Sequence, residues 1–171
     1  TGYDTTGISK ANIFHSGSNR MGNLAFRPSD GSTVEFWMKK DAYLAAPNEN
    51  KVESIFNLAA SGSFDNAYGD FSVFVNGGSA TRDKILVTID TGASSIDHRH
   101  DTNLSAGIAD GKWHHYAVTV KSTGSANTVT KLFVDGVLQS SLVSATGIFE
   151  VTGTKGMVAA LGALAATKIK S

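Results

Sequence analysis

The sequence predicts an all-β fold in which two antiparallel sheets pack face to face as a sandwich. Short runs of alternating apolar and polar residues recur along the 171-residue chain, and such alternation is typical of strands with one buried face. The chain has 18 glycines but only two prolines, which suits many tight turns between strands. No window shows the apolar spacing of a long amphipathic helix.

The predicted strands follow one another along most of the chain, separated by turns rich in Gly, Ser, Asn and Asp. Residues 161–168 have a helical composition, but the piece is short. There is no internal repeat and no low-complexity linker, so residues 1–171 are expected to form a single domain. The main strands are expected at 33–39, 53–59, 71–75, 84–90, 96–102, 113–120, 130–134, 148–151 and 157–161.

The segment 110–140 forms the predicted centre of the fold, with paired strands at 113–120 and 130–134. Along 113–120, every second residue from His114 to Val120 points to one side, as in a strand with one buried face. Asp135-Gly136 stands between two valines and predicts a two-residue hairpin of type I′, which needs positive φ at both central residues.

Three segments carry a family resemblance: Asp-Gly-x-Trp-His-His at 110–115, Leu-Phe-Val-Asp-Gly-Val-Leu at 132–138 and STVEFWMK at 32–39. Together they resemble the laminin G-like branch of the concanavalin A-like lectin/glucanase superfamily, over roughly Asp30 to Leu161. The resemblance implies an antiparallel jelly-roll sandwich. That fold carries lectins, glycosidases, adhesion modules and structural domains, so it specifies function much less closely than fold.

The same resemblance gives three further expectations. Trp37 and Trp113 lie inside family-like strand motifs, so we expect both indoles to be buried in the core. Of His114 and His115, one is expected to lie in or beside the core. The family usually continues with a closing strand of the type Phe-x-Gly-x-Ile-Asp-x-Val, which this sequence lacks, so the chain is expected to be a piece of a longer polypeptide.

Composition excludes several classes of partner. Fifteen basic and fifteen acidic residues give zero net charge, and the basic residues are scattered, so nucleic acid is not an expected partner. There is no cysteine, which excludes disulfides and thiol chemistry. No segment reaches the roughly 18 consecutive apolar residues of a membrane helix, so membrane insertion is not expected.

Glycosidases of this superfamily place acidic residues at alternate positions of one strand, which brings two carboxylates to one face. The chain's glutamates are Glu35, Glu49, Glu53 and Glu150, and none forms a convincing pair of this kind on a strand. We therefore expect no enzyme activity, and glycoside hydrolase is the third and least favoured function.

The loop at 63–70, SFDNAYGD, offers Asp65, Asn66 and Asp70 as oxygen ligands at short spacing, which suits calcium. Its Asp-Asn pair also resembles the start of the calcium loop of pentraxins, which share the sandwich. The alternative is an ordinary turn in which Asp and Asn cap backbone groups. Calcium is the cofactor that this loop suggests.

A second candidate site is the pentapeptide Asp97-His98-Arg99-His100-Asp101. On a strand, His98 and His100 share one face at a spacing that can chelate a transition metal, with Asp97 or Asp101 as a further ligand. The alternative is a polar, solvated edge strand.

Together these features predict a non-catalytic binding or adhesion module. Glycan recognition through rim loops is the first hypothesis, with Asp65, Asn66, Tyr68 and His100 as contacts. The alternative is a structural or protein-interaction domain of a virion, from a phage or another virus, or of a large surface assembly. The expected partner is a carbohydrate or a protein, and the expected location is extracellular, at a cell surface or in a virion.

Overall fold

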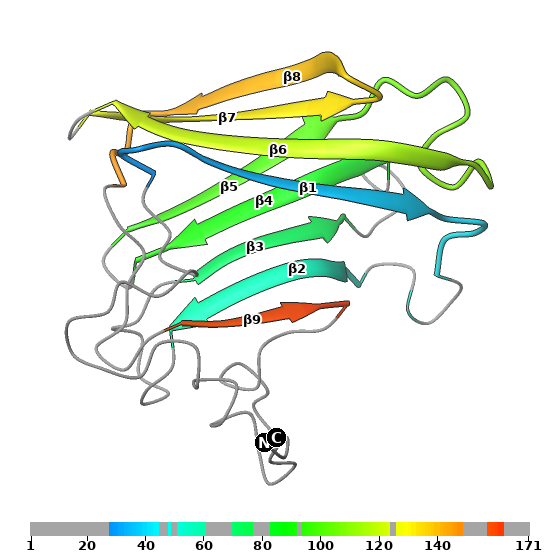
Figure 1. Ribbon diagram of the computed structural model, residues 1–171, viewed down its shortest axis with the longest axis horizontal. Coiled ribbons are helices and arrows are strands. Elements are labelled where there is room, and N and C mark those ends of the chain that lie inside the picture. Colours follow the sequence, from blue (N-terminus) through cyan, green and yellow to red (C-terminus); the bar gives the residue numbers. More distant parts are fainter. Residues whose placement is uncertain are drawn as a thin grey trace, which may run out of the picture.

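The computed structural model describes residues 28–44, 48, 51–60, 70–76, 83–91, 94–123, 126–148 and 157–162. These residues form nine strands and no helix, in two antiparallel sheets that pack as a jelly-roll sandwich (Figure 1). The described part of the chain therefore contains no helix of the length and hydropathy needed to cross a bilayer.

The smaller sheet has the strand order β1-β6-β7-β8 and the larger sheet the order β5-β4-β3-β2-β9. Strand β1 thus lies beside β6, which joins distant parts of the sequence (Figure 1). The four-stranded sheet contains β1 Ser32–Lys39, β6 Trp113–Thr123, β7 Asn127–Val134 and β8 Val137–Ser144. The five-stranded sheet contains β5 Ser95–Asp101, β4 Lys84–Asp90, β3 Asp70–Val75, β2 Glu53–Ala60 and β9 Met157–Leu161.

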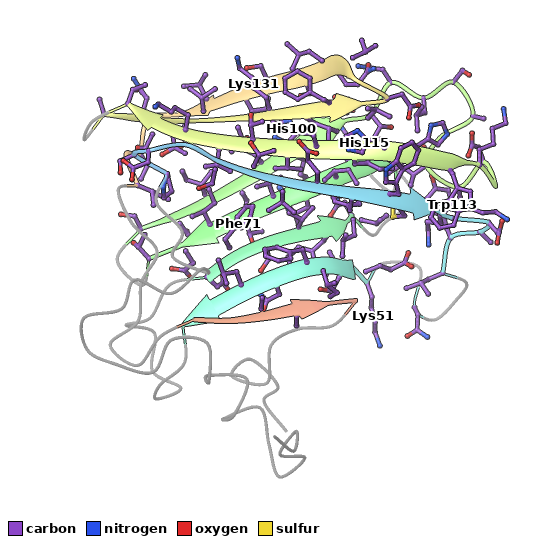
Figure 2. All side chains as sticks on the ribbon, viewed as in Figure 1. Lys51, Phe71, His100, Trp113, His115 and Lys131 are labelled. Atoms are coloured by element: carbon purple, nitrogen blue, oxygen red, sulfur yellow. The ribbon has the colours of Figure 1, made fainter. Side chains whose placement is uncertain are left out.

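The core lies between the inner faces of the two sheets and consists of the apolar residues that alternate along their strands. From β6, Tyr116, Val118 and Val120 are buried, as the alternation at 113–120 predicts. Phe71 of β3 is also completely buried between the sheets (Figure 2). The core cluster is completed by Leu58, Val73, Val75, Ile85, Val87, Ile89, Ile96, Ile108, Leu132, Val134 and Ile148.

The observed strands extend several of the predicted ones. Strand β6 continues to Thr123 and β7 begins at Asn127, so the central hairpin is longer than the apolar pattern indicates. Ile148 is buried but does not lie in a strand, while 149–151 fall outside the described residues. Of the stretch 161–168, Leu161 ends β9 and residues 163–168 lie outside the described part.

The predicted hairpin turn at Asp135-Gly136 is confirmed. Asp135 has φ of 51° and Gly136 has φ of 79°, the two positive values that a type I′ turn requires. The turn joins β7 to β8 and pairs Val134 with Val137.

Candidate functional site

The two tryptophans lie on the surface, and the expectation that they serve the core is wrong. The exposed fraction is 65% for Trp37 and 64% for Trp113. The neighbours of Trp37 explain its position, because Phe36 and Met38 occupy the inward positions of β1 and pack against the core. Trp37 falls on the alternate, outward positions of the same strand.

Strand register brings the two indoles to one face. Trp37 of β1 is the antiparallel partner of His115 of β6, and Lys39 is the partner of Trp113. Trp37 and Trp113 are therefore diagonal neighbours on adjacent strands, with His115 between them on the same side. The Trp37 and His115 rings lie 5.3 Å apart between centroids at an angle of 45°. Figure 2 labels Trp113 and His115 on β6.

We call the surface formed by Trp37, His115 and Trp113 the aromatic surface. Each of its flanks carries a pair of polar groups. On one flank, Glu35 Oε2 lies 3.7 Å from His115 Nε2. On the other, Lys39 Nζ lies 3.2 Å from Asp41 Oδ1. Glu35 thus lies beside the imidazole of His115, and Lys39 forms an ion pair with Asp41.

A row of residues beside the aromatic surface crosses the whole sheet. Glu35 pairs with Ala117, Ala117 with Phe133, and Phe133 with Leu138, so these four residues form one row across β1, β6, β7 and β8. Leu138 is exposed and Phe133 is half-buried. Phe133 and Leu138 thus place partly exposed apolar side chains on neighbouring strands of this face.

His114, on the opposite side of β6 from His115, ties the start of the strand to two loops. Its Nδ1 lies 2.6 Å from Asp135 Oδ2 and its Nε2 lies 3.1 Å from Asp110 Oδ2. Both bonds raise the pKa of His114, and the bond to Asp135 is the larger cause. They therefore favour the imidazolium, which donates from both nitrogens. The expectation that one of the two histidines lies beside the core is met by His114, whose side chain is mostly buried.

The two aspartates in turn hold backbone groups. Asp135 Oδ1 accepts a bond of 2.9 Å from the backbone N–H of His115, and Asp110 Oδ1 accepts one of 2.9 Å from that of Lys112. The bond from His114 lowers the pKa of Asp135, while the bond from the Lys112 backbone is the main cause that lowers the pKa of Asp110. Both nitrogens of His114 are therefore occupied, and the cluster fixes the backbone that carries Trp113 and His115.

The histidines of β5 lie inside the sandwich, so His100 does not contact a ligand at the rim. His100 is completely buried between the sheets (Figure 2), and its Nε2 lies 2.7 Å from Thr130 Oγ1. His98 is also buried, with Nδ1 2.6 Å from the same hydroxyl. Asp97 and Asp101 are exposed on the other face of the strand.

This alternation also overturns the transition-metal site predicted on β5. The carboxylates of Asp97 and Asp101 cannot reach a metal held by His98 and His100, because successive side chains point to opposite faces. Within the described ranges, no cluster of three or more His, Asp or Glu residues could hold a metal ion. Strand β5 is an edge strand, as the alternative proposed, but only its Asp97, Arg99 and Asp101 face is solvated.

The predicted calcium loop lies mostly outside the described residues. Asp65, Asn66 and Tyr68 fall in the gap between residues 60 and 70, so their role in binding calcium or glycan stays a prediction. Asp70 is described: it begins β3 and is buried.

The described glutamates have separate surroundings. Glu53 forms an ion pair with Lys40, with 2.7 Å between Oε2 and Nζ. Glu35 stands on the outer face of β1, where its neighbours in alternation are Thr33 and Trp37 rather than a second acid. Glu49 and Glu150 lie outside the described residues.

One feature of the sequence could have placed the indoles correctly. Glu35, Trp37 and Lys39 share one face of β1, and a face that carries two charged residues is the one exposed to solvent. The family-like motif favoured a buried Trp37, whereas alternation with charged neighbours favours an exposed one. Alternation gives the same indication for Trp113, which falls on the face of Thr119 and Lys121 rather than on the apolar face of the strand.

Comparisons with known proteins agree with this fold. The laminin G family model described as the concanavalin A-like lectin/glucanases superfamily matches residues 11–167. Domains LG4-5 of the mouse laminin alpha1 chain are similar in structure, with a TM-score of 0.52 and 15% identity over 82% of this chain and 32% of that chain. No curated protein matches.

Two further solved structures show weaker likeness. The receptor-binding domain of botulinum neurotoxin type G has a TM-score of 0.45 and 16% identity, over 77% of this chain and 33% of that one. A Bacillus licheniformis beta-glucanase has a TM-score of 0.44 and 14% identity, over 81% and 54%. This chain thus spans about a third of the first two structures. The match of the family model over most of the chain shows that it belongs to the laminin G-like branch of the concanavalin A-like superfamily.

Proposed function

We propose that this domain is a non-catalytic carbohydrate-binding module that holds glycan on the aromatic surface of the four-stranded sheet. One observation carries the proposal: both tryptophans of the chain stand exposed, side by side on one face of paired strands. Leaving two indoles in water forgoes the stabilisation that burial would give, and exposed aromatic residues grouped in this way mark interaction surfaces.

The chemistry of the surface suits sugars. A pyranose ring has an apolar face of C–H bonds that stacks on an indole, and hydroxyl groups around its edge that form hydrogen bonds. Glu35 and His115 stand beside Trp37 and offer an acceptor carboxylate and an imidazole. Because these side chains project from paired strands, their spacing is set by the sheet and is largely preorganised.

The same surface argues against hydrolysis at this place. Glycosidases generally use two carboxyl groups about 5–9.5 Å apart, one on each side of the scissile bond. Glu35 is flanked by Thr33 and Trp37 on its face of β1, and the facing residues of β6 are His115, Ala117 and Thr119. Glu35 therefore has no second carboxyl group among its neighbours on β1 and β6, which suits binding rather than cleavage.

The rim loop remains a second place for glycan. Asp65, Asn66 and Tyr68, with calcium held by Asp65, Asn66 and Asp70, stay a proposal. A calcium-dependent rise in melting temperature that Asp65→Ala abolishes would support this loop.

A second candidate function is protein contact inside a virion or a large assembly at the surface of a cell. The observation that favours it is the apolar character of β8, where Val137, Leu138 and Val143 are exposed. Laminin G-like domains are typically extracellular, so for either function we propose a location outside the cell, at a cell surface or in a virion.

A glycan array read with matched variants tests the first proposal. Wild-type protein is expected to bind a subset of glycans, and Trp37→Ala or Trp113→Ala is expected to weaken this binding by about tenfold or more, a loss of about 1.4 kcal/mol. Val143→Ser is the control, because Val143 is 62% exposed on the same sheet but lies several residue rows from the indoles.

Two results would contradict the proposal. The first is glycan binding that survives both tryptophan substitutions. The second is the absence of binding to any glycan. If that absence is accompanied by self-association that Leu138→Asp abolishes, the protein-contact function is favoured instead.

A further inference from the structure

We infer, on the basis of the proposed function, that the aromatic surface selects a neutral, extended polysaccharide of β-linked, gluco-configured sugars, with Glu35 as its main polar contact. The ligand would lie across β1 and β6, with successive sugar rings on Trp37 and Trp113. Three features carry the inference: the charges beside the indoles, the diagonal placement of the indoles on one sheet face, and the exposed carboxylate next to Trp37.

The charges favour a neutral ligand. Lys39 is the cation nearest to Trp113 in the sheet register, and it is already engaged by Asp41. Glu35 is 62% exposed beside His115. An acidic sugar stacked on Trp37 would meet the carboxylate of Glu35, since Lys39 is paired with Asp41 and Lys112 stands before the start of β6. Bringing like charges together as they lose water is costly.

The remaining lysines of this face stand further away. Lys131 of β7 shares a row with Thr33 and Thr119, beyond the row of Glu35 and Ala117. Lys121 lies one outward position further along β6. A ring stacked on Trp37 would therefore lie closer to Glu35 than to either lysine, and a neutral ring avoids the unfavourable contact.

The placement of the indoles favours a β-linked chain. Trp37 and Trp113 project from the same face of adjacent antiparallel strands, so their stacking positions lie side by side over a sheet rather than inside a cavity. In gluco-configured sugars the ring substituents are equatorial, which leaves both ring faces apolar. β-1,4 Linkages keep successive rings extended, whereas α-1,4-linked glucans curve away from a continuous surface.

Glu35 supplies the directional contact. It stands two residues from Trp37 on the same face of β1, so its carboxylate lies beside a ring stacked on that indole. A carboxylate accepts from two hydroxyl groups at once, and vicinal equatorial hydroxyls offer that pair. Glu35→Gln keeps the shape of the side chain but removes the charge from these bonds.

Intrinsic fluorescence gives a direct experiment, because both tryptophans of the chain belong to the surface. The protein would be titrated with a cello-oligosaccharide, a malto-oligosaccharide and an oligoalginate, each at low salt and at about 0.5 M salt. We expect the cello-oligosaccharide to bind about tenfold or more tightly than the other two, with no dependence on salt. Trp37→Ala should weaken this binding by about tenfold or more, and Glu35→Gln should weaken it several-fold.

The outcomes separate this inference from the proposed function. A preference for oligoalginate that weakens with salt and is lost in Lys39→Gln overturns neutrality. Equal or tighter binding of the malto-oligosaccharide overturns the choice of linkage, and undiminished binding by Glu35→Gln overturns the role of that carboxylate. In each case a glycan still binds and the proposed function stands. If the protein binds none of these three oligosaccharides and no glycan on the array, both the inference and the proposed function are contradicted.

Discussion

Trp37 and Trp113 show that the face of a strand on which a residue falls decides whether its side chain lies in the core or on the surface. Both residues occur in motifs that resemble core strands, yet alternation turns them outward. The inward positions of β1 carry Val34, Phe36 and Met38, which already supply the apolar contacts of that strand. The indoles are therefore available for binding, and the free energy of unfolding depends little on them.

We predict that Trp37→Ala or Trp113→Ala lowers the free energy of unfolding by about 1 kcal/mol or less, because the lost contacts are mostly with solvent. Phe71→Ala, at a completely buried position, should cost about 3–5 kcal/mol. Urea denaturation followed by circular dichroism measures both, and iodide should quench the wild-type indole fluorescence readily. A loss at Trp37 as large as that at Phe71, or indoles shielded from iodide, would contradict the exposed placement.

At Gly136 the conformation of the backbone decides which residue fits. A Cβ at this position would meet no atom within 4 Å, so a substitution there is resisted by the backbone and not by crowding. With φ of 79°, Gly136→Ala should cost about 1–2 kcal/mol, and Gly136→Val should cost more. Gly136→Asn should cost least, because Asn tolerates this conformation. Thermal melting orders the three variants, and an unchanged melting temperature for Gly136→Val would argue against the turn.

At the scale of the element, β5 is a strand with a charged outer face and an inner face on which two histidines stand beside Ile96. Its outward residues are Asp97, Arg99 and Asp101, and its inward histidines share the hydroxyl of Thr130 in β7. Burial lowers the pKa of His98, and burial together with neighbouring His98 lowers the pKa of His100 to about 4. Asp97 and Asp101 oppose these shifts from the outer face, where Asp101 also pairs with Lys84.

These shifts predict an acid-sensitive edge of the sandwich. Between pH 6.5 and about 4 the unfolded chain binds protons that native His100 does not, so stability falls as the pH drops through this window. The loss should reach at most about 3 kcal/mol and stop near pH 4. Urea denaturation between about pH 7 and pH 4 measures it.

The double variant His98→Gln/His100→Gln tests whether these two histidines cause the loss of stability at acid pH. It should flatten the stability profile across this window, because glutamine does not titrate. Amide exchange should show β5 opening before β3 at low pH, since β5 lies at the sheet edge and β3 at its centre. If the double variant keeps the wild-type slope, the buried histidines do not cause the acid loss.

At the scale of the whole molecule, His114 gives the opposite dependence on pH. Its hydrogen bonds to Asp135 and Asp110 raise its pKa, so its contribution to stability is fully present below 6.5 and is lost as the pH rises through the folded value. The domain should therefore be most stable near neutrality, with His98 and His100 lowering stability on the acid side and His114 on the alkaline side.

We predict that His114→Gln removes the alkaline decline and leaves the acid decline in place. The amide can still donate a hydrogen bond to one aspartate, but it carries no charge to lose. Melting temperatures recorded from about pH 5 to about pH 9 measure both limbs, with the β5 double variant as the reciprocal control. An alkaline decline that persists in His114→Gln would assign it to another group.

The sequence by itself determined the features that depend on neighbours in the chain. Alternation placed Tyr116, Val118 and Val120 in the core, and Asp135-Gly136 specified its turn, because period-two patterns and positive φ are local properties. The number of short strands and the absence of helical spacing determined the sandwich. The three segments that resemble laminin G-like domains then indicated which kind of sandwich it is.

Only the tertiary structure decided which residues meet across strands. Alternation groups His98 and His100 with Ile96, opposite Asp97, Arg99 and Asp101, and so favours an inward histidine face, but it does not say what the histidines contact there. The histidines turn inward because a neutral imidazole loses less on leaving water than a carboxylate, and Thr130, 30 residues or more away, provides their hydrogen bonds. The aromatic surface arises in the same way, since the register of β1 against β6 brings Trp37, His115 and Trp113 together across the sequence.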